Sequence, residues 1–393
     1  MVNRSENYQQ LESASILCLG LGWFPTSPGG LERYVYELTH QLTTKGDRVE
    51  LCGVGLPPQT SNPHLKLTNL AAPDTSILSR LQSCRRQFRA TRGQEKPDAI
   101  NLHFALYASP ILDLLPKDVP ITFNFHGPWV SESQEETDRN KLLDNLKRWL
   151  IEQRTYNRCD RFIVLSKAFG TILHQEYHIP WSKIHIIPGA AETERFAPTL
   201  SPQAAREKLG WHTERPILYT ARRLVQRVGL DKLINAVAQI KTQIPDIWLA
   251  IAGRGYLQET LEAQVQALGL EDNIKFVGFL PDGDLPIAYQ AANLTIMPSQ
   301  SFEGFGLAIV ESLACGTPVI CTPIGGMPEI LTPFSPQLIT SSTNENAIAT
   351  TIIDALQGKI PIPSRNQCRE YALSHFTWEK VAEDIRKVLL MPK

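Results

Sequence analysis

Short apolar segments alternate with longer amphipathic segments along most of this 393-residue chain. In the first half, five short apolar runs are typical of buried strands, at 16–22, 48–54, 98–103, 121–126 and 161–165. Two longer segments, 31–45 and 140–158, have apolar residues spaced three and four apart, as in amphipathic helices. Strands that alternate with helices predict a parallel sheet with helices packed against it.

Prolines and glycines interrupt this alternation between 188 and 202, and a second series then begins. Its predicted strands are 217–220, 247–252, 274–277, 294–297 and 319–321. A helix is expected at 230–241 and a final amphipathic helix at 376–390. Because the chain is too long for one ordinary domain, we expect two α/β domains. Ligands should bind beyond the carboxyl ends of the strands, in a cleft between the domains.

Composition narrows the classes of protein that fit. Hydrophobic residues make up 42% and charged residues 20% of the chain, as in ordinary globular enzymes, and a net charge of −1 gives no field that would attract nucleic acid. No apolar run approaches the ~20 residues of a membrane-spanning helix, and the polar N-terminus lacks the core of a secretion signal. The seven cysteines form no CxxC pair, which favours reduced thiols in the cytoplasm over disulfides or a metal cluster.

The most informative segment is 301–326, SFEGFGLAIVESLACGTPVICTPIGG. It holds two acids, Glu303 and Glu311, with glycines between them just before a helix-like run. Glycines let backbone N–H groups approach a phosphate, and a helix N-terminus favours an anion. Carboxylates accept hydrogen bonds from sugar hydroxyls. The segment therefore predicts a site for an anionic ligand rich in hydroxyl groups.

Three features of the first half are candidates for the same site. Gly29 and Gly30 open the helix after the first strand, and they form either a simple turn or a loop whose amides reach a phosphate. His126 ends a strand and is either structural or a hydrogen-bond donor to a sugar hydroxyl or a leaving phosphate. A GxG at 20–22 also follows a strand, but Pro25 stands where a dinucleotide fingerprint needs its third glycine, so a dehydrogenase is not favoured.

A basic loop, RRLVQRVG at 222–229, follows the first strand of the second half. It is either a solvated loop or a functional one. A nucleoside diphosphate gains negative charge as its bond to a sugar breaks, and paired cations such as Arg223 and Arg227 would stabilise that charge without a metal ion. Gly253 lies in the turn after the next strand, where a glycine also suits an ordinary strand-to-helix turn.

Taken together, these motifs resemble the retaining "group 1" glycosyltransferases, whose GT-B fold has two Rossmann-like domains with parallel sheets facing across a cleft. The resemblance implies that Glu303 contacts the donor sugar, that Glu311 holds the ribose, and that backbone amides at 304–307 take the diphosphate. His126, Glu303, Arg223 and Arg227 are the implied catalytic residues. The implied donor-binding residues are Gly29, Gly30, Arg223, Arg227, Gly253, Val277, Glu303, Gly304, Phe305, Gly306, Leu307 and Glu311.

One position departs from the family pattern. The family usually has a lysine just before the glycine of the basic loop, and this chain has Val228 there. Arg227 is the expected substitute, although its planar fork grips phosphate differently from an ammonium group. The resemblance further implies an acceptor-side domain at 1–190, a nucleotide-sugar-binding domain at 191–372, and a C-terminal helix within 373–393 that crosses back to the first domain.

The implied activity is transfer of a sugar from a nucleotide-diphosphate sugar, with UDP-sugar favoured over GDP-sugar, to a hydroxyl of a glycan, lipid-linked or small-molecule acceptor. Retention of anomeric configuration is implied, with neither a metal ion nor a cofactor beyond the donor co-substrate. Polysaccharide biosynthesis is the expected setting. Two alternatives stay open: a nucleotide-sugar epimerase of the same fold, and a non-catalytic nucleotide-sugar-binding module. A pyridoxal phosphate-dependent phosphorylase would need a lysine that the strand ends lack.

Residues 77–93, ILSRLQSCRRQFRATRG, suggest a second kind of partner. Five arginines and no acid occur here, interleaved with apolar residues. Such a basic amphipathic stretch either lies on an anionic membrane or is a solvated helix face. The expected location is therefore the cytoplasm, with peripheral contact at the inner face of the membrane as one reading of this stretch.

Overall fold

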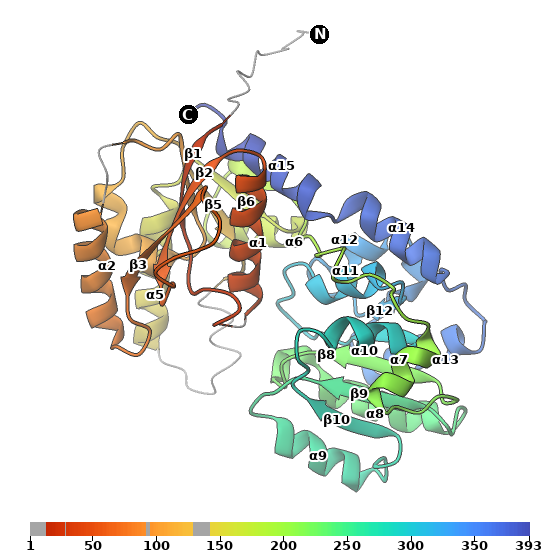
Figure 1. The fold of residues 1–393 in the computed structure, drawn as a ribbon. Helices are drawn as coiled ribbons and strands as arrows, with labels where there is room; N and C mark the ends of the chain where they lie inside the picture. Colours follow the sequence, from red (N-terminus) through yellow and green to blue (C-terminus); the bar gives the residue numbers. More distant parts are fainter. Residues whose placement is uncertain (1–12, 28, 92–94, 129–141) are drawn as a thin grey trace, which may run out of the picture.

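The computed structural model describes residues 13–27, 29–91, 95–128 and 142–393, which form two lobes, each built on a parallel sheet (Figure 1). The strand order of the first sheet is β3–β2–β1–β4–β5–β6–β7. Its strands are β1 (Ser15–Leu19), β2 (Arg48–Val54), β3 (Leu65–Ala71), β4 (Ala99–Leu102), β5 (Ile121–Phe125), β6 (Arg161–Val164) and β7 (Ile184–Ile186). The helices of this lobe are α1 (Gly30–Thr44), α2 (Ile77–Thr91), α3 (Ala105–Ala108), η1 (Ser109–Leu114), α5 (Leu142–Tyr156), α6 (Lys167–Glu176) and η2 (Trp181–Lys183).

The second lobe repeats the design with the strand order β10–β9–β8–β11–β12. Its strands are β8 (Ile217–Ala221), β9 (Trp248–Ala252), β10 (Ile274–Gly278), β11 (Leu294–Met297) and β12 (Val319–Cys321). Its helices are α7 (Pro202–Leu209), η3 (Gln226–Val228), α8 (Leu230–Lys241), α9 (Gln258–Ala267), α10 (Leu285–Ala291), α11 (Leu307–Ala314), α12 (Met327–Leu331), η4 (Pro336–Leu338), α13 (Glu345–Leu356) and α14 (Arg365–His375). The expected fold class, an α/β protein with two parallel sheets, is confirmed.

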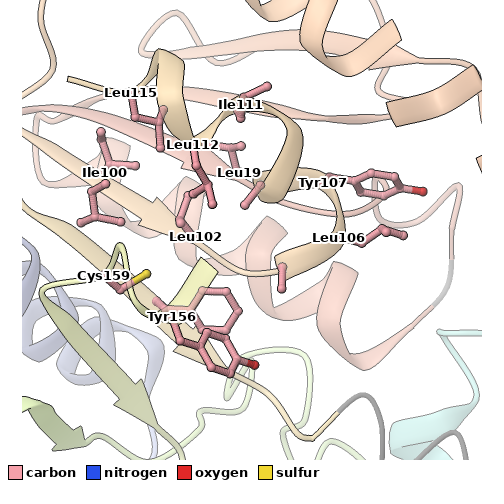
Figure 2. Close-up of a cluster of buried hydrophobic side chains, with 14 of the residues drawn as sticks. Leu19, Ile100, Leu102, Leu106, Tyr107, Ile111, Leu112, Leu115, Tyr156 and Cys159 are labelled. Carbon is pink, nitrogen blue, oxygen red and sulfur yellow. The ribbon is translucent and has the colours of Figure 1, made fainter. Parts of the chain in front are cut away.

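Helices cover both faces of the first sheet, so its central strands are buried throughout. Every position of β4 and β5 is buried, and most of these positions are apolar. Figure 2 shows Ile100 and Leu102 of β4 gathered with Leu112 of η1 and Tyr156 of α5 in one hydrophobic cluster. Burying such an aliphatic side chain stabilises the fold by roughly 1.5–3 kcal/mol. This packing fixes the strand ends that border the cleft.

The chain returns to the first lobe through the last helix, α15 (Trp378–Leu389), which packs beside α1 (Figure 1). Trp378 and Ile385 join the same apolar cluster as Val35 of α1. Arg386 donates two hydrogen bonds to the buried carboxylate of Asp47, at 2.7 and 2.8 Å. The crossing begins where residue 377 pairs with 191, so the expected boundary at 373 falls inside α14 and not between two helices.

The basic segment 77–93 forms α2, and its apolar face packs on its own lobe. Phe88 is buried in the first core, with Leu81 packed against it. Arg85 is held by both carboxylate oxygens of Asp113. Two apolar residues at the start of the helix remain exposed, and so do Arg86 and Arg89, while Arg92 lies outside the described residues. Within the described ranges, no helix is both long enough and apolar enough to cross a membrane.

Candidate active site

A cleft of about 640 Å³ lies between the lobes and is lined by residues of both. The carboxyl ends of β1, β4 and β5 border it on one side, and the loops that follow β8 and β11 border it on the other. Open α/β sheets typically bind ligands at this end of their strands. Most of the residues expected from the sequence line this cleft: Gly29, Gly30, His126, Arg223, Arg227, Glu303, Gly304, Phe305, Gly306 and Leu307. Gly253, Val277 and Glu311 are not among its lining residues.

The glycine loop before α11 makes close contact with the first lobe. A Cβ on Gly304 would lie 2.7 Å from a ring carbon of Phe169, which belongs to α6. Gly306, the residue that caps α11, has a φ of +98°, in the region that favours glycine. The helix therefore starts at Leu307 with its free N–H groups beside the cleft. That arrangement suits an anionic ligand.

Glu303 is held by Arg222, a residue that the sequence interpretation passed over in favour of Arg223. Nη2 of Arg222 donates to Oε2 of Glu303, and the hydroxyl of Ser299 donates to the same oxygen at 3.2 Å. Burial alone would raise the pKa of the Glu303 carboxyl, but the nearby arginine brings it below its usual value. Glu303 is therefore an ionised acceptor at the cleft wall.

The two arginines expected to act on phosphate differ in placement. Arg223 is exposed and lines the cleft. Arg227 also lines it and donates from Nη1 to the carbonyl oxygen of Phe302, at 3.1 Å. Val228, where the family pattern has lysine, is instead buried in a hydrophobic core of the second lobe. The cleft-facing cation of this short helical turn is thus Arg227 and not the residue at 228.

Gly253 and Val277 lie behind the arginine loop. A Cβ on Gly253, whose φ is +134°, would lie 1.9 Å from the carbonyl oxygen of Arg222, so only glycine fits this turn. Val277 is half-buried on β10 and packs against a core of the second lobe. Gly253 therefore allows the turn after β9 to pack closely against the arginine loop.

Glu311 lies at the contact between the lobes. Its Oε2 accepts a hydrogen bond from the hydroxyl of Tyr289 at 3.1 Å, and its Oε1 is 3.8 Å from Nη1 of Arg33 on α1. Burial raises the pKa of Glu311, and Arg33 only partly offsets that effect. Arg33 also pairs with Asp282 at 2.9 Å, so one arginine of the first lobe reaches two acids of the second. Local sequence patterns do not indicate this arginine's role, because its partners are distant in the chain.

His126 lies against a second histidine that the sequence interpretation also missed. Nε2 of His126 is 3.3 Å from Nδ1 of His103, which follows the neighbouring strand β4. Burial lowers the pKa of His126 to about 3, so the ring is neutral near pH 7. Among the residues that the structure describes, no three His, Cys, Asp or Glu side chains converge in the manner of a metal site.

The fold and this interlobe cleft define a protein of the GT-B class. Its backbone is similar to sucrose-phosphate synthase from Thermosynechococcus elongatus, with a TM-score of 0.77, 23% identity, and coverage of 95% of this chain and 98% of that one. It is also similar to Anabaena HepE in complex with UDP, with a TM-score of 0.72, 18% identity, and coverage of 96% and 99%. At these identities the likeness concerns the fold.

Sequence comparison then places the chain in a family. The model "Glycosyltransferase Family 4" matches residues 28–195, and "Glycosyl transferases group 1" matches residues 202–375. The chain belongs to the group 1 glycosyltransferases. It is 31% identical to a GDP-mannose-dependent alpha-(1-6)-phosphatidylinositol monomannoside mannosyltransferase of Mycolicibacterium smegmatis, over 51% of this chain and 54% of that protein. It is 26% identical to a D-inositol 3-phosphate glycosyltransferase of Corynebacterium jeikeium, over 92% and 91%. The match to the first of these relatives thus spans about half of its length.

Proposed function

We propose that this protein is a retaining glycosyltransferase that moves a sugar from a nucleoside-diphosphate sugar to a hydroxyl group of an acceptor. The observation that carries the proposal is the cleft itself. On one wall it has an ionised glutamate, arginines and a glycine-lined helix start, and on the other wall a neutral histidine and the two glycines at the start of α1. We favour UDP-sugar over GDP-sugar as the donor, and a glycan, lipid-linked or small-molecule acceptor.

In this proposal the second lobe holds the donor. Arg223 and Arg227 face the diphosphate, and the free N–H groups at the start of α11 donate hydrogen bonds to its oxygens. Glu303 accepts hydrogen bonds from hydroxyls of the transferred sugar, and Glu311 holds the ribose. In this scheme, a ribose bound to the Glu311 carboxylate would share that carboxylate with Arg33 or displace Arg33 from it. Donor binding would therefore change a contact between the two lobes.

The proposed chemistry keeps the reaction on one face of the sugar. The bond between the anomeric carbon and the phosphate oxygen breaks, and the acceptor oxygen forms a bond to the same carbon on the same face. The proton of the acceptor hydroxyl passes to the leaving phosphate. The arginines stabilise the charge that builds on the diphosphate, so in this scheme neither a metal ion nor a further cofactor takes part. Exclusion of water by the closed cleft would protect the donor from hydrolysis.

Donor binding and turnover test the proposal separately. A thermal-shift screen with UDP-, GDP- and ADP-sugars should raise the melting temperature for the true donor. With that donor, Glu303→Gln should lower kcat/KM by about 100-fold or more, because a strong acceptor for the sugar is weakened. Glu259→Gln, at an exposed position of α9, is the matched control and should not change turnover. Nuclear magnetic resonance of the product should show the anomeric configuration of the donor.

The same experiment separates the alternatives. Binding of a donor with no transfer to any hydroxyl acceptor would favour the binding module and overturn the enzyme. Appearance of an epimeric sugar from the donor alone would favour the epimerase. Transfer with inverted configuration would leave the transferase standing but would refute retention.

Peripheral contact with anionic lipid at the cytoplasmic face of a membrane is proposed only for the exposed part of α2. Ile77 and Leu78 are 53% and 75% exposed at its start, and Arg86 and Arg89 are exposed along it. Arg86→Glu/Arg89→Glu should abolish flotation with phosphatidylserine-containing vesicles. The charge-matched control, Lys208→Glu/Lys275→Glu on the second lobe, should not affect flotation. Equal flotation of both variants would refute this contact.

A further inference from the structure

Two neighbouring strands of the first sheet end in the same tripeptide pattern, asparagine, any residue, histidine. Asn101 lies in β4 and Asn124 in β5, and His103 and His126 directly follow these strands. The strands are parallel neighbours, and residues two apart along a strand point to the same face. The pattern therefore stacks two asparagines and two histidines on one face, next to the cleft.

Hydrogen bonds join these four side chains into one ladder that starts at α1. The hydroxyl of Tyr34 donates to Oδ1 of Asn124 at 3.3 Å, and Nδ2 of Asn124 donates to Oδ1 of Asn101. Nδ2 of Asn101 is 3.0 Å from Nε2 of His103. Nδ1 of His103 is 3.3 Å from Nε2 of His126. The ladder ends at the histidine that lines the cleft.

Burial makes the ladder specific. The first four members are each at most 2% exposed, and unpaired polar atoms at such positions are costly. Oδ1 of Asn101 accepts a hydrogen bond from Asn124, so Nδ2 of Asn101 is the group that donates a hydrogen bond to Nε2 of His103. A neutral His103 that accepts at Nε2 carries its proton on Nδ1 and donates it to Nε2 of His126. His126 then carries its own proton on Nδ1.

We propose that His103 is a positioning residue which, with the two asparagines and Tyr34, fixes His126 in the tautomer protonated at Nδ1. His126 would then offer the cleft a permanent N–H donor, and its Nε2 would be unavailable as a base. This inference rests on the proposed function, because the oxygen that receives the hydrogen bond belongs to the donor sugar or its leaving phosphate. It also explains why the proton of the acceptor hydroxyl would pass to the phosphate and not to His126.

The electrostatics of the pair agree with this assignment. Burial lowers the pKa of both imidazoles, that of His103 well below its usual value. A hydrogen bond between Nδ1 of His103 and Nε2 of His126 needs one protonated and one unprotonated nitrogen. Two neutral imidazole rings meet this requirement. The ring of Tyr34 packs edge-on to His126 with centroids 4.8 Å apart, which restrains the orientation of the imidazole.

Nitrogen resonances of the histidine rings test the ladder without any substrate. In protein labelled with ¹⁵N-histidine, long-range ¹H–¹⁵N spectra distinguish protonated from bare ring nitrogens, and the variants His103→Gln and His126→Gln assign the signals. We expect protonated Nδ1 and bare Nε2 in both rings, unchanged between pH 5 and 8. A protonated Nε2 in His126, or titration of its ring in that interval, would overturn the proposal.

Substitutions then connect the tautomer to turnover. Asn101→Leu removes the donor to His103 and should shift His126 toward a mixture of tautomers, with kcat lowered about 10-fold and KM changed less than 2-fold. His103→Gln, whose amide can still donate to His126, should retain more activity than His103→Leu. Thr122→Val is the matched control, since the buried Thr122 hydroxyl on β5 has no hydrogen-bond partner in the described structure. It should leave both the spectrum and kcat unchanged.

The outcomes separate this inference from the proposed function. If Asn101→Leu does not fold, Tyr34→Phe provides the milder test, since it removes only the terminal hydroxyl and should move the same resonances by a smaller amount. Unchanged tautomers in folded Asn101→Leu would overturn the ladder. Loss of kcat with unchanged tautomers would likewise overturn it. The expected tautomers in a protein that transfers no sugar would support the ladder and overturn the proposed function instead.

Discussion

Removal of the arginine beside Glu303 should have a large effect on stability. Arg222 and Glu303 are 11% and 14% exposed, and their ion pair is completed by Ser299, which accepts from Arg222 at 3.1 Å and donates to Glu303. Arg222→Met keeps most of the side-chain volume and removes the charge. The carboxylate then stays in a nearly dry site with one neutral donor and the more distant Arg227.

The magnitude follows from the geometry. Breaking a buried ion pair by removing one partner costs about 3–5 kcal/mol, because a charge is left without compensation. Because Glu303 keeps some exposure to solvent and a hydrogen bond from Ser299, we expect Arg222→Met to cost about 3 kcal/mol, near the lower end of this range. Replacing both partners, in Arg222→Met/Glu303→Gln, removes the uncompensated charge. The double variant should therefore recover on the order of 2 kcal/mol relative to additive single effects.

The penalty also depends on pH, with a defined sign. In the native protein the pKa of Glu303 lies below its usual value, so its stabilising contribution is present above the pKa of an unfolded glutamate. That contribution is lost as the pH falls through the lower, folded pKa. Without Arg222, desolvation dominates and the pKa rises above the unfolded value. The destabilisation by Arg222→Met should therefore be largest at neutral pH and shrink toward pH 4.

Urea unfolding of the four proteins in this cycle, at pH 7 and pH 5, measures both effects. The reasoning would be refuted if the two single substitutions were additive to within about 0.5 kcal/mol. It would also be refuted if the cost of Arg222→Met did not decrease toward acid pH.

Three further expectations concern other parts of the molecule. Asp47→Asn should lower the free energy of unfolding by about 3 kcal/mol, because it breaks the buried pair that holds α15 on the first lobe. Lys387→Ala on the same helix, whose acidic partners are exposed, should leave the urea midpoint unchanged. Thr220→Val should raise the thermal midpoint, with a gain on the order of 1 kcal/mol, because the buried Thr220 hydroxyl has no hydrogen-bond partner in the described structure; a lower midpoint would contradict this. All seven cysteines are buried, which raises the pKa of their thiols, so a disulfide reagent at pH 8 should label the native protein far more slowly than the urea-unfolded one. Rapid labelling of the native protein would show that the thiols are not protected by burial and would contradict this expectation.

Hydrophobic periodicity predicted most of the regular elements because it is a local property. The bounds of β2, β11, β12 and α8 agree with the sequence prediction at both ends. The strands β3 and β7 were missed. The edge strand β3 reads LKLTNLA, with polar residues among the apolar ones, and β7 has three residues. Such strands are recognised through the neighbour they pair with, which a local pattern does not contain.

The sequence by itself determined the family motifs and the residues that line the second lobe's half of the cleft, since glycines and acids at fixed spacing act within one loop. Tertiary structure decided which cation each acid meets. It paired Glu303 with Arg222, brought Arg33 from the other lobe to Glu311, and buried Val228 in a core. It also joined the two asparagine–histidine pairs into one ladder. These partners are set by strand order and lobe packing, which place residues far apart in the chain within hydrogen-bond distance.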